Sequence, residues 1–291
     1  MARPKLVLAV IDGLHPAALR TAIADGTAPA LAAIAVRATI DTVATAAFPS
    51  VTPVCAATIA TGVRQEAHRI PSMNWYSRDE ERYVEYGSSF SAARAFGVRR
   101  QLVDAVYELN GSHLAPETPT VFETLDDLGV RTAGTTYLIY RGRYRHEMAR
   151  EFPASSFVAR SLFGDRSVMG PRELFYADLF ASRRTGCRSL FGNPGQRDRH
   201  SGCVGAFLVE HDLFDFLLFS LPDNDNYSHK HGPLASVRSI ERADYCMAEV
   251  IRAAGGIEPF LAEQAWPAED KLVEAGSVPT TKSKARARAG R

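Results

Sequence analysis

The sequence predicts an α/β fold, a three-layer α/β/α sandwich with a mainly parallel sheet, and three observations carry that prediction. Residues 5–11 form a continuous apolar run of strand length that ends at Asp12-Gly13. Residues 213–221 form a second such run, which leads straight into acidic residues. Runs without alternation are typical of strands covered on both faces of a parallel sheet. Residues 121–138 repeat the order helix, glycine, strand that marks an α/β unit.

The other elements follow in chain order. Residues 15–24 have helical composition, and residues 35–45 suggest a second strand because they are rich in β-branched side chains. A helix of small residues is expected to run from Thr52 to a glycine stop at Gly62. The last predicted helix covers residues 237–254 and ends at two glycines.

Two stretches do not follow this alternation of helices and strands. Residues 71–111 are rich in Tyr, Ser and Arg, and residues 141–200 are loop-like, with 12 arginines against 6 acids. Both are predicted to be cap-like insertions in a core that spans residues 1–262. The arginines either bind an anionic substrate or form a solvated surface. Residues 263–291 are predicted to be an irregular, disordered basic tail, and the sheet to be incomplete at that end, because no strand-length apolar run occurs there.

Composition narrows the class of function. The last fifteen residues carry five basic side chains, and the rest of the chain has 29 basic and 33 acidic residues, which argues against a nucleic-acid-binding body. The first apolar run is too short for a signal peptide or a membrane span. The four cysteines form no CxxC pair and are predicted to be reduced thiols of a cytoplasmic protein.

Thr52 is the first candidate for chemistry. It precedes Pro53 and a run of small residues, so it fits the ordinary N-cap of a helix. In a second reading, its hydroxyl lies beside free backbone N–H groups and the positive end of the helix dipole, where a phosphate is favoured. The sequence of this segment alone leaves both readings open.

Acidic residues follow both predicted core strands. Asp12 stands where open α/β sheets place ligand-binding groups, although aspartate is also a common turn residue. Residues 221–233 place two carboxylates and two imidazoles within nine residues, a ligand set suited to zinc or another first-row divalent metal. Asp225 and His229 would meet if residues 226–229 form a helical turn. A loop of hydrogen-bonded caps is the alternative.

The order and spacing of these motifs resemble the type I phosphodiesterase and nucleotide pyrophosphatase family of the alkaline phosphatase superfamily. The resemblance covers roughly residues 5–260. The stretch after Gly62 is a close but imperfect match to the family's pattern. The motifs that carry the resemblance are Ile11-Asp12-Gly13, Thr52 nine residues before Thr61-Gly62, Glu66-Ala67-His68-Arg69-Ile70, and Asp225-Asn226-Tyr227-Ser228-His229-Lys230-His231-Gly232-Pro233.

The resemblance implies a hydrolase of phosphodiester or pyrophosphate bonds that uses two divalent metal ions, generally zinc, and a phosphothreonine intermediate. By position, Asp12 and Thr52 would serve one metal, with Thr52 as the nucleophile, and Asp225 and His229 would hold the other. The implied substrate is a small phosphate ester or a nucleotide. Candidate site residues of lower priority are Asp223, His231 and Asn74. His15 and His68 are further possible metal ligands.

The metal set is incomplete by comparison with the family. The family adds an Asp-His pair on a later strand and one more histidine, whereas no histidine follows His231. We therefore expect a truncated or frame-shifted family member. A non-catalytic chain that keeps the fold is one alternative to an active phosphodiesterase, and a phosphomonoesterase or another hydrolase of the superfamily is a second. Sulfatase chemistry is disfavoured, because it would need a modified cysteine and Cys55 lies three residues too late.

Overall fold

The computed structural model describes residues 5–39, 41, 44–88, 90–149, 157, 160–161, 163–164, 166–189, 193–262 and 264. Within them the central sheet has the strand order β1 (Leu6–Ile11), β9 (Phe216–Leu221), β4 (Thr132–Thr135), β7 (Glu173–Tyr176) and β8 (Phe180–Ala181). The first four strands are parallel to their neighbours, and β8 pairs with β7 in the antiparallel sense. The mainly parallel sheet predicted from the sequence is confirmed.

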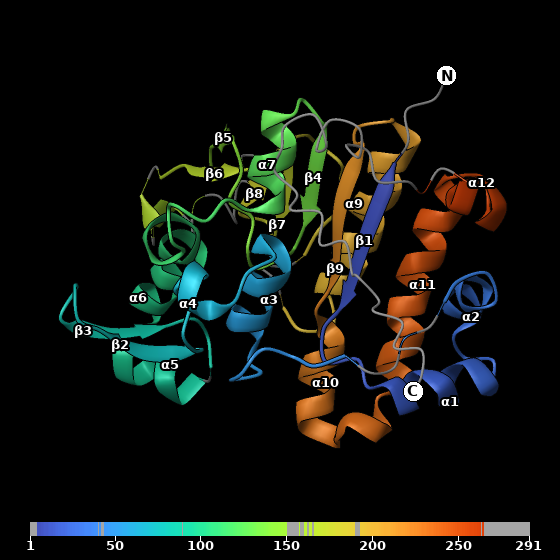
Figure 1. Cartoon of the computed structure of the whole chain (residues 1–291), viewed down its shortest axis with the longest axis horizontal. Helices are drawn as coiled ribbons and strands as arrows, with labels where there is room; N and C mark the ends of the chain where they lie inside the picture. Colours follow the sequence, from blue (N-terminus) through green and yellow to red (C-terminus); the bar gives the residue numbers. More distant parts are fainter. Residues whose placement is uncertain are drawn as a thin grey trace, which may run out of the picture.

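Strand β9 is buried over its whole length and sends alternate side chains to opposite faces of the sheet. On one face they pack with α3 (Thr52–Thr61) and α7 (Val121–Asp127). On the other face they pack with α9 (Arg197–Glu210) and α11 (Val237–Ala253). Figure 1 shows these helices on the two sides of the sheet. The continuous apolar run therefore reflects a strand inside a three-layer sandwich.

Most of the predicted elements lie where the sequence placed them, including α1 (Pro16–Ala24), α3, α7, β4, β9 and α11. Gly62 ends α3 in the left-handed conformation, at φ 71°. The further helical elements are α2 (Pro29–Ala35), α4 (Gln65–His68), α5 (Phe90–Phe96), α6 (Val98–Val103), the π-helix η1 (Asp104–His113), α10 (Asp223–His231), the 3₁₀ turn η2 (Pro233–Ala235) and α12 (Ile257–Ala262).

Residues 35–45 do not form the strand that their β-branched side chains predicted. Ala35 is the last residue of α2, and the described residues of the rest of this stretch form turns and irregular structure. Pro29 supplies a fixed φ at the start of that helix, and the alanines that follow have high helix propensity. The helical signal of residues 29–35 therefore extends into the start of the predicted strand.

The two predicted insertions contain small elements of their own, on one side of the sheet in Figure 1. Residues 71–111 hold the hairpin of β2 (Asn74–Ser77) and β3 (Arg82–Glu85), followed by α5, α6 and most of η1. Residues 141–200 hold the hairpin of β5 (Tyr144–His146) and β6 (Val168–Gly170). This second stretch also contributes β7 and β8 to the central sheet, so it is not wholly loop-like.

A disulfide joins Cys187 to Cys203, so the prediction of four reduced cysteines is wrong. The two residues are 16 apart in sequence, and their Cα atoms lie 5.9 Å apart across the start of α9. Spacing alone cannot reveal such a pair. Cys55 and Cys246 are free thiols. Because disulfides persist mainly in oxidising compartments, the prediction of a cytoplasmic location loses its basis.

The chain leaves α12 along the free edge of β1. Gln264 accepts a hydrogen bond from the Val7 N–H at 2.9 Å and forms a parallel bridge with Lys5. The rest of the predicted basic tail, residue 263 and residues 265–291, lies outside the described residues. None of the described helices combines the length and the apolar character that crossing a bilayer requires.

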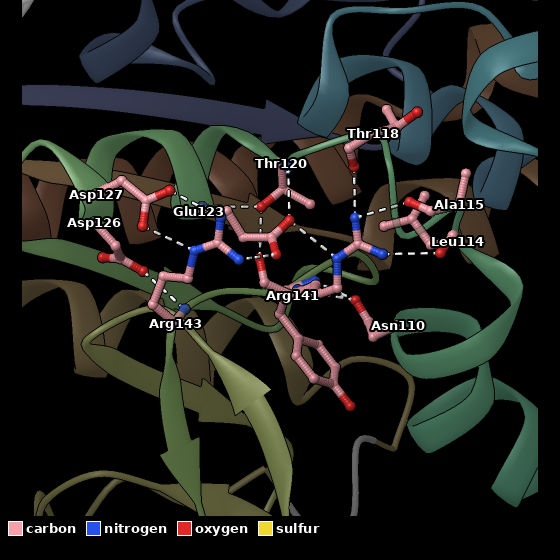
Figure 2. Close-up of polar contacts among 11 residues, drawn as sticks. Asn110, Leu114, Ala115, Thr118, Thr120, Glu123, Asp126, Asp127, Arg141 and Arg143 are labelled. Carbon is pink, nitrogen blue, oxygen red and sulfur yellow. Dashed lines mark hydrogen bonds and ion pairs between the residues drawn. The ribbon is translucent and has the colours of Figure 1, made fainter.

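A buried ion-pair network ties α7 to the end of η1, beside the edge of the sheet (Figure 2). Arg141 donates to the Glu123 carboxylate at 3.0 Å, and Glu123 in turn accepts from the Thr120 N–H in a capping box at the start of α7. Arg143 extends the network to Asp127 on the surface. The Arg141 guanidinium also donates to three backbone carbonyl groups, those of Leu114, Ala115 and Thr118.

Candidate active site

The carboxyl ends of β1 and β9 form the edge of the sheet where the main candidate residues meet. The two strands are parallel, with Ile11 opposite Leu221, and the Asp12 N–H donates to the Leu221 carbonyl at 3.1 Å. Asp12 therefore follows β1 beside the point where α10 follows β9. This is the edge at which open α/β sheets bind their ligands.

Gly13 allows α10 to approach the Asp12 turn closely. Its φ of 66° lies in the left-handed region. A Cβ atom at this position would lie 3.0 Å from the Cα of Asp225 and 3.1 Å from its Oδ1. A side chain there would push α10 away, so the glycine sets the approach of Asp225 to the turn that carries Asp12.

Thr52 lies in the first turn of α3, but it does not cap the helix. The N-cap is Val51, and no side chain accepts a capping hydrogen bond there. The Thr52 hydroxyl donates instead to Oδ2 of Asp12, at 3.3 Å. The N-cap reading of Thr52 is therefore wrong, and two candidate residues 40 positions apart are in contact.

The amino end of α3 presents partial positive charge beside this hydroxyl. Pro53 has no N–H, and the N–H groups of Val54 and Cys55 both donate to the Val51 carbonyl at 3.1 Å. Within the described part of the chain, the Thr52 N–H has no hydrogen-bond partner. One backbone amide and the helix dipole are therefore available to an anion, fewer groups than the sequence reading assumed.

The Asp12 carboxyl is in an unfavourable place for a negative charge. Burial raises its pKa, and the nearby Asp225 carboxylate raises the pKa further. Hydrogen bonds from Thr52 and Gly13 and the charge of Arg197 act in the opposite direction. Two carboxylates held together in a partly buried site would be stabilised by a cation.

Asp225 and His229 lie one turn apart on α10, with 3.5 Å between His229 Nε2 and Asp225 Oδ1. The predicted helical turn is thus confirmed. The His229 side chain is 78% exposed and that of Asp225 33%. Asn224 fixes this helix to the Asp12 turn, because its Nδ2 donates to the Asp12 carbonyl at 2.9 Å and its Oδ1 accepts from Ser239 at 2.7 Å.

Asp223 is engaged elsewhere. Its carboxylate pairs with Arg197 at 2.8 Å and accepts the Asp198 N–H at 3.1 Å, while Asp198 accepts the Asp223 N–H at 2.9 Å. The two aspartates therefore cap the first turns of α9 and α10 reciprocally. Arg197, whose charge reaches Asp12, was missed by sequence reasoning, because its partner lies 26 residues away and no motif surrounds it.

The remaining candidate site residues make their described contacts away from Asp12 and Asp225. The ring of His231 lies 4.3 Å from a tyrosine of its own helix, and Asn74 opens β2 in the outer hairpin. His15 caps α1 through Nδ1. His68 is fully buried and contacts the Thr58 hydroxyl at 3.2 Å, so it supports α3 from beneath. No hydrogen bond or ion pair between these four residues and Asp12 or Asp225 occurs in the described ranges.

The described residues contain no cluster of three or more His, Cys, Asp or Glu side chains arranged to hold a metal ion. The donors nevertheless have the chemistry that a divalent cation needs, because two carboxylates and a hydroxyl meet at one edge with an imidazole next to them. The raised pKa of Asp12 shows that its charged form is disfavoured, and a cation in the same place would stabilise that form. The donor types thus fit a metal, while the number of gathered ligands is small.

His200 gives this edge of the sheet a dependence on pH. It is buried on α9 and contacts the Thr136 hydroxyl, just after β4, at 3.3 Å. Burial lowers its pKa from 6.5 to about 4. Since the unfolded chain binds the proton more tightly, stability is lost as pH falls from about 6.5 towards 4.

We expect the wild-type chain to lose about 2 kcal/mol of unfolding free energy through His200 between pH 7 and pH 5. His200→Gln should lack this part of the acid sensitivity. Urea denaturation of both chains at the two pH values measures the difference. Equal losses in the two chains would show that His200 is protonated in the folded state.

This sequence and fold are similar to those of known proteins. The sequence model of the type I phosphodiesterase / nucleotide pyrophosphatase family matches residues 6–255. No curated protein sequence gives a significant match. Among solved structures, phosphonoacetate hydrolase from Sinorhizobium meliloti in complex with phosphonoformate is similar, with a TM-score of 0.55, 19% identity, and coverage of 86% of this chain and 54% of that chain.

Murine ectonucleotide pyrophosphatase / phosphodiesterase 5 is similar as well, with a TM-score of 0.54, 12% identity, and coverage of 88% of this chain and 53% of that chain. Its inactive threonine-to-alanine variant in complex with AMP is similar too, with a TM-score of 0.54, 11% identity, and coverage of 89% of this chain and 54% of that chain. At such identities the likeness shows the fold. The chain spans about half the length of these solved chains.

Proposed function

The chain belongs to the type I phosphodiesterase / nucleotide pyrophosphatase family, and from this membership we propose that it hydrolyses phosphodiester or pyrophosphate bonds of small phosphate esters or nucleotides. The observation that carries the proposal is the Thr52 hydroxyl, at the amino end of α3, in contact with the Asp12 carboxylate. This arrangement places a nucleophile, Thr52, next to a proton acceptor, Asp12, at a helix end that favours phosphate.

In the first step, Thr52 Oγ forms a bond to phosphorus, and the bond from phosphorus to the leaving oxygen breaks. The Thr52 hydroxyl donates to Asp12 Oδ2 at 3.3 Å, so Asp12 is placed to receive the Thr52 proton as the bond to phosphorus forms. The Thr52 N–H and the dipole of α3 stabilise charge on the phosphoryl oxygens. Water then attacks phosphorus and releases one proton to solvent, while Thr52 Oγ leaves and takes back its proton from Asp12.

Asp12 and Thr52 would hold one divalent cation, and Asp225 and His229 a second, with zinc the metal expected. When bound, such cations favour the ionised hydroxyl and neutralise charge on the attacking and leaving oxygens. Within the chain itself, Asn224 holds the Asp225 helix on the Asp12 turn, and Gly13 permits that approach. These two residues would set the spacing of the two halves of the site.

Two neighbours support the class of substrate. The murine protein was solved with AMP, and its variant is inactive after a threonine-to-alanine change. The bacterial neighbour was solved with phosphonoformate and with phosphonoacetate. Each ligand carries a tetrahedral phosphorus centre on a small molecule. A compact phosphorus-containing substrate would suit the exposed edge beside Asp225 and His229.

A second candidate function is a non-catalytic role for a chain that keeps the family fold. It is favoured by one observation, namely that no three metal-binding side chains gather in the part of the chain that the structure describes. A chain of this kind would bind a cation weakly and turn over nothing. A single assay distinguishes the two candidate functions.

Hydrolysis of bis(4-nitrophenyl) phosphate, with added zinc and with a chelator, separates them. We expect zinc-dependent turnover that is faster on this diester than on 4-nitrophenyl phosphate. Asp225→Asn should reduce both zinc binding and turnover by about tenfold or more, because a carboxylate ligand is lost. Asp79→Asn, an exposed change in the β2–β3 turn, serves as the control. Absence of bound zinc together with absence of turnover would favour the non-catalytic role.

A further inference from the structure

A cavity of about 520 Å³ opens at the amino-terminal edge of the sheet, between the β5–β6 hairpin and the start of β7. Its size is that of a small-molecule site. We propose that this cavity binds a protonated phosphate group, either inorganic phosphate or a small phosphomonoester. The proposal is independent of the activity assigned to Thr52.

The cavity is separate from the candidate active site. Glu173, which lines it, pairs with Ala133, Ala133 pairs with Leu217, and Leu217 pairs with Val7. Glu173 therefore lies level with the first residues of β1, whereas Asp12 follows the last residue of that strand. In Figure 1, β5 and β6 lie near the opposite end of the sheet from α10.

Three arginines line the cavity and make it attractive to an anion. Arg145 is in β5, Arg172 directly precedes β7, and Arg183 follows β8. The Arg145 and Arg172 side chains are exposed and have no acidic partner among the described residues. Guanidinium groups bind phosphate oxygens through paired hydrogen bonds. Within the described part of the chain, Arg145 and Arg172 are thus cations without an acidic partner, and both line the same cavity.

Glu173 adds a requirement for a hydrogen-bond donor. Its side chain is only 4% exposed, and its Oε1 accepts from Arg183 at 2.6 Å. Its other oxygen, Oε2, is buried and has no hydrogen-bond donor among the described residues. A buried carboxylate oxygen in this state is costly, and a small rotation of the Glu173 side chain toward the cavity would let a ligand O–H donate to it. An anion that also carries an O–H group meets both needs, and protonated phosphate is such an anion, whereas sulfate at neutral pH is not.

The walls of the cavity are fixed in place by the chain itself. His146 Nε2 lies 2.7 Å from the Pro171 carbonyl, to which it donates, so that β5 is held against the residue before Arg172. Burial lowers the pKa of His146, so the charged form of the ring is disfavoured. A Cβ atom at Gly142 would lie 2.2 Å from the Gly170 backbone, so these two segments are in close contact. The cavity is therefore present before any ligand arrives.

Calorimetric titration tests the proposal, with the full chain in a chelator at pH 6, where phosphomonoesters carry a proton about half of the time. The chelator leaves the Asp12 and Asp225 carboxylates without a cation, so that edge repels anions. The probes are inorganic phosphate, methyl phosphate and sulfate. We expect inorganic phosphate to bind at least about tenfold more tightly than sulfate, because only phosphate can donate to Glu173.

Three variants locate the site. Arg145→Gln and Arg172→Gln should each weaken phosphate binding by about tenfold, since a charged hydrogen bond is lost. Glu173→Gln should bring the affinities for phosphate and sulfate close together. Arg20→Gln, an exposed change on α1, and Thr52→Ala should leave binding unchanged.

Methyl phosphate distinguishes the two sources of the ligand. Methyl phosphate binding as tightly as inorganic phosphate would assign the cavity to phosphomonoesters, and preference for inorganic phosphate would assign it to the free ion. Phosphate binding that is absent, equal to sulfate binding in the wild-type chain, or unchanged by both arginine substitutions would overturn the proposal.

Discussion

Replacement of Thr52 by alanine should lower kcat/KM for a phosphodiester by at least about 10³-fold, because the reaction loses its nucleophile. The hydroxyl that the change removes is the group in contact with Asp12. Thr52→Ser keeps a hydroxyl at the same place and should retain most of the activity. Steady-state hydrolysis with saturating zinc measures all three chains.

Thr61→Ala is the matched control on the same helix. The Thr61 hydroxyl donates to the Ala57 carbonyl at 2.7 Å, within the last turn of α3 and away from Asp12. This variant should keep wild-type kinetics. Turnover by Thr52→Ala at a rate within about tenfold of wild type would show that another group attacks phosphorus.

Replacement of Arg141 by methionine should lower the free energy of unfolding by about 3 kcal/mol. Methionine fills much of the same volume but donates no hydrogen bonds. The change leaves a buried Glu123 oxygen without its guanidinium partner and removes one donor from each of three backbone carbonyl groups (Figure 2). Removing one partner of a buried ion pair costs far more than removing an exposed one. Urea denaturation monitored by circular dichroism gives the difference.

Asp127→Asn provides the control within the same network. The Arg143–Asp127 pair is half exposed on both sides, so its loss should cost less than about 1 kcal/mol. A loss for Arg141→Met as small as that of the control would mean that water replaces the guanidinium. The buried network would then contribute little to the free energy of unfolding through the packing of α7 against the end of η1.

The sequence was most informative for the strands of the central sheet, of which β9 is buried throughout and β1, at the edge, is partly exposed. Strands β1 and β9 were predicted because their apolar runs lack alternation, which only a strand with cover on both faces requires. The same reasoning predicted that Asp12 and Asp225 each follow a buried strand, and the structure places these two strands side by side. Thr52 was found through a helix that begins with a proline after the hydroxyl and ends at a glycine. These features depend on local composition, which a single sequence displays directly.

Features that depend on contacts between distant segments were missed. The Cys187–Cys203 bond and the Arg197–Asp223 pair each need α9 to pack in one particular place. The reading of Thr52 as a cap was wrong because Val51, an apolar residue, takes that position once Asp12 accepts the hydroxyl. In each case the deciding partner is supplied by the tertiary structure.

The central claim is that Thr52 attacks phosphorus, and trapping the covalent adduct tests it most directly. The zinc-loaded chain is mixed with a phosphodiester, quenched in acid during turnover, digested and analysed by mass spectrometry. We expect the phosphoryl group of the substrate on Thr52, together with its absence from Thr52→Ala. Turnover without modification of Thr52, or with the group on another side chain, would contradict it.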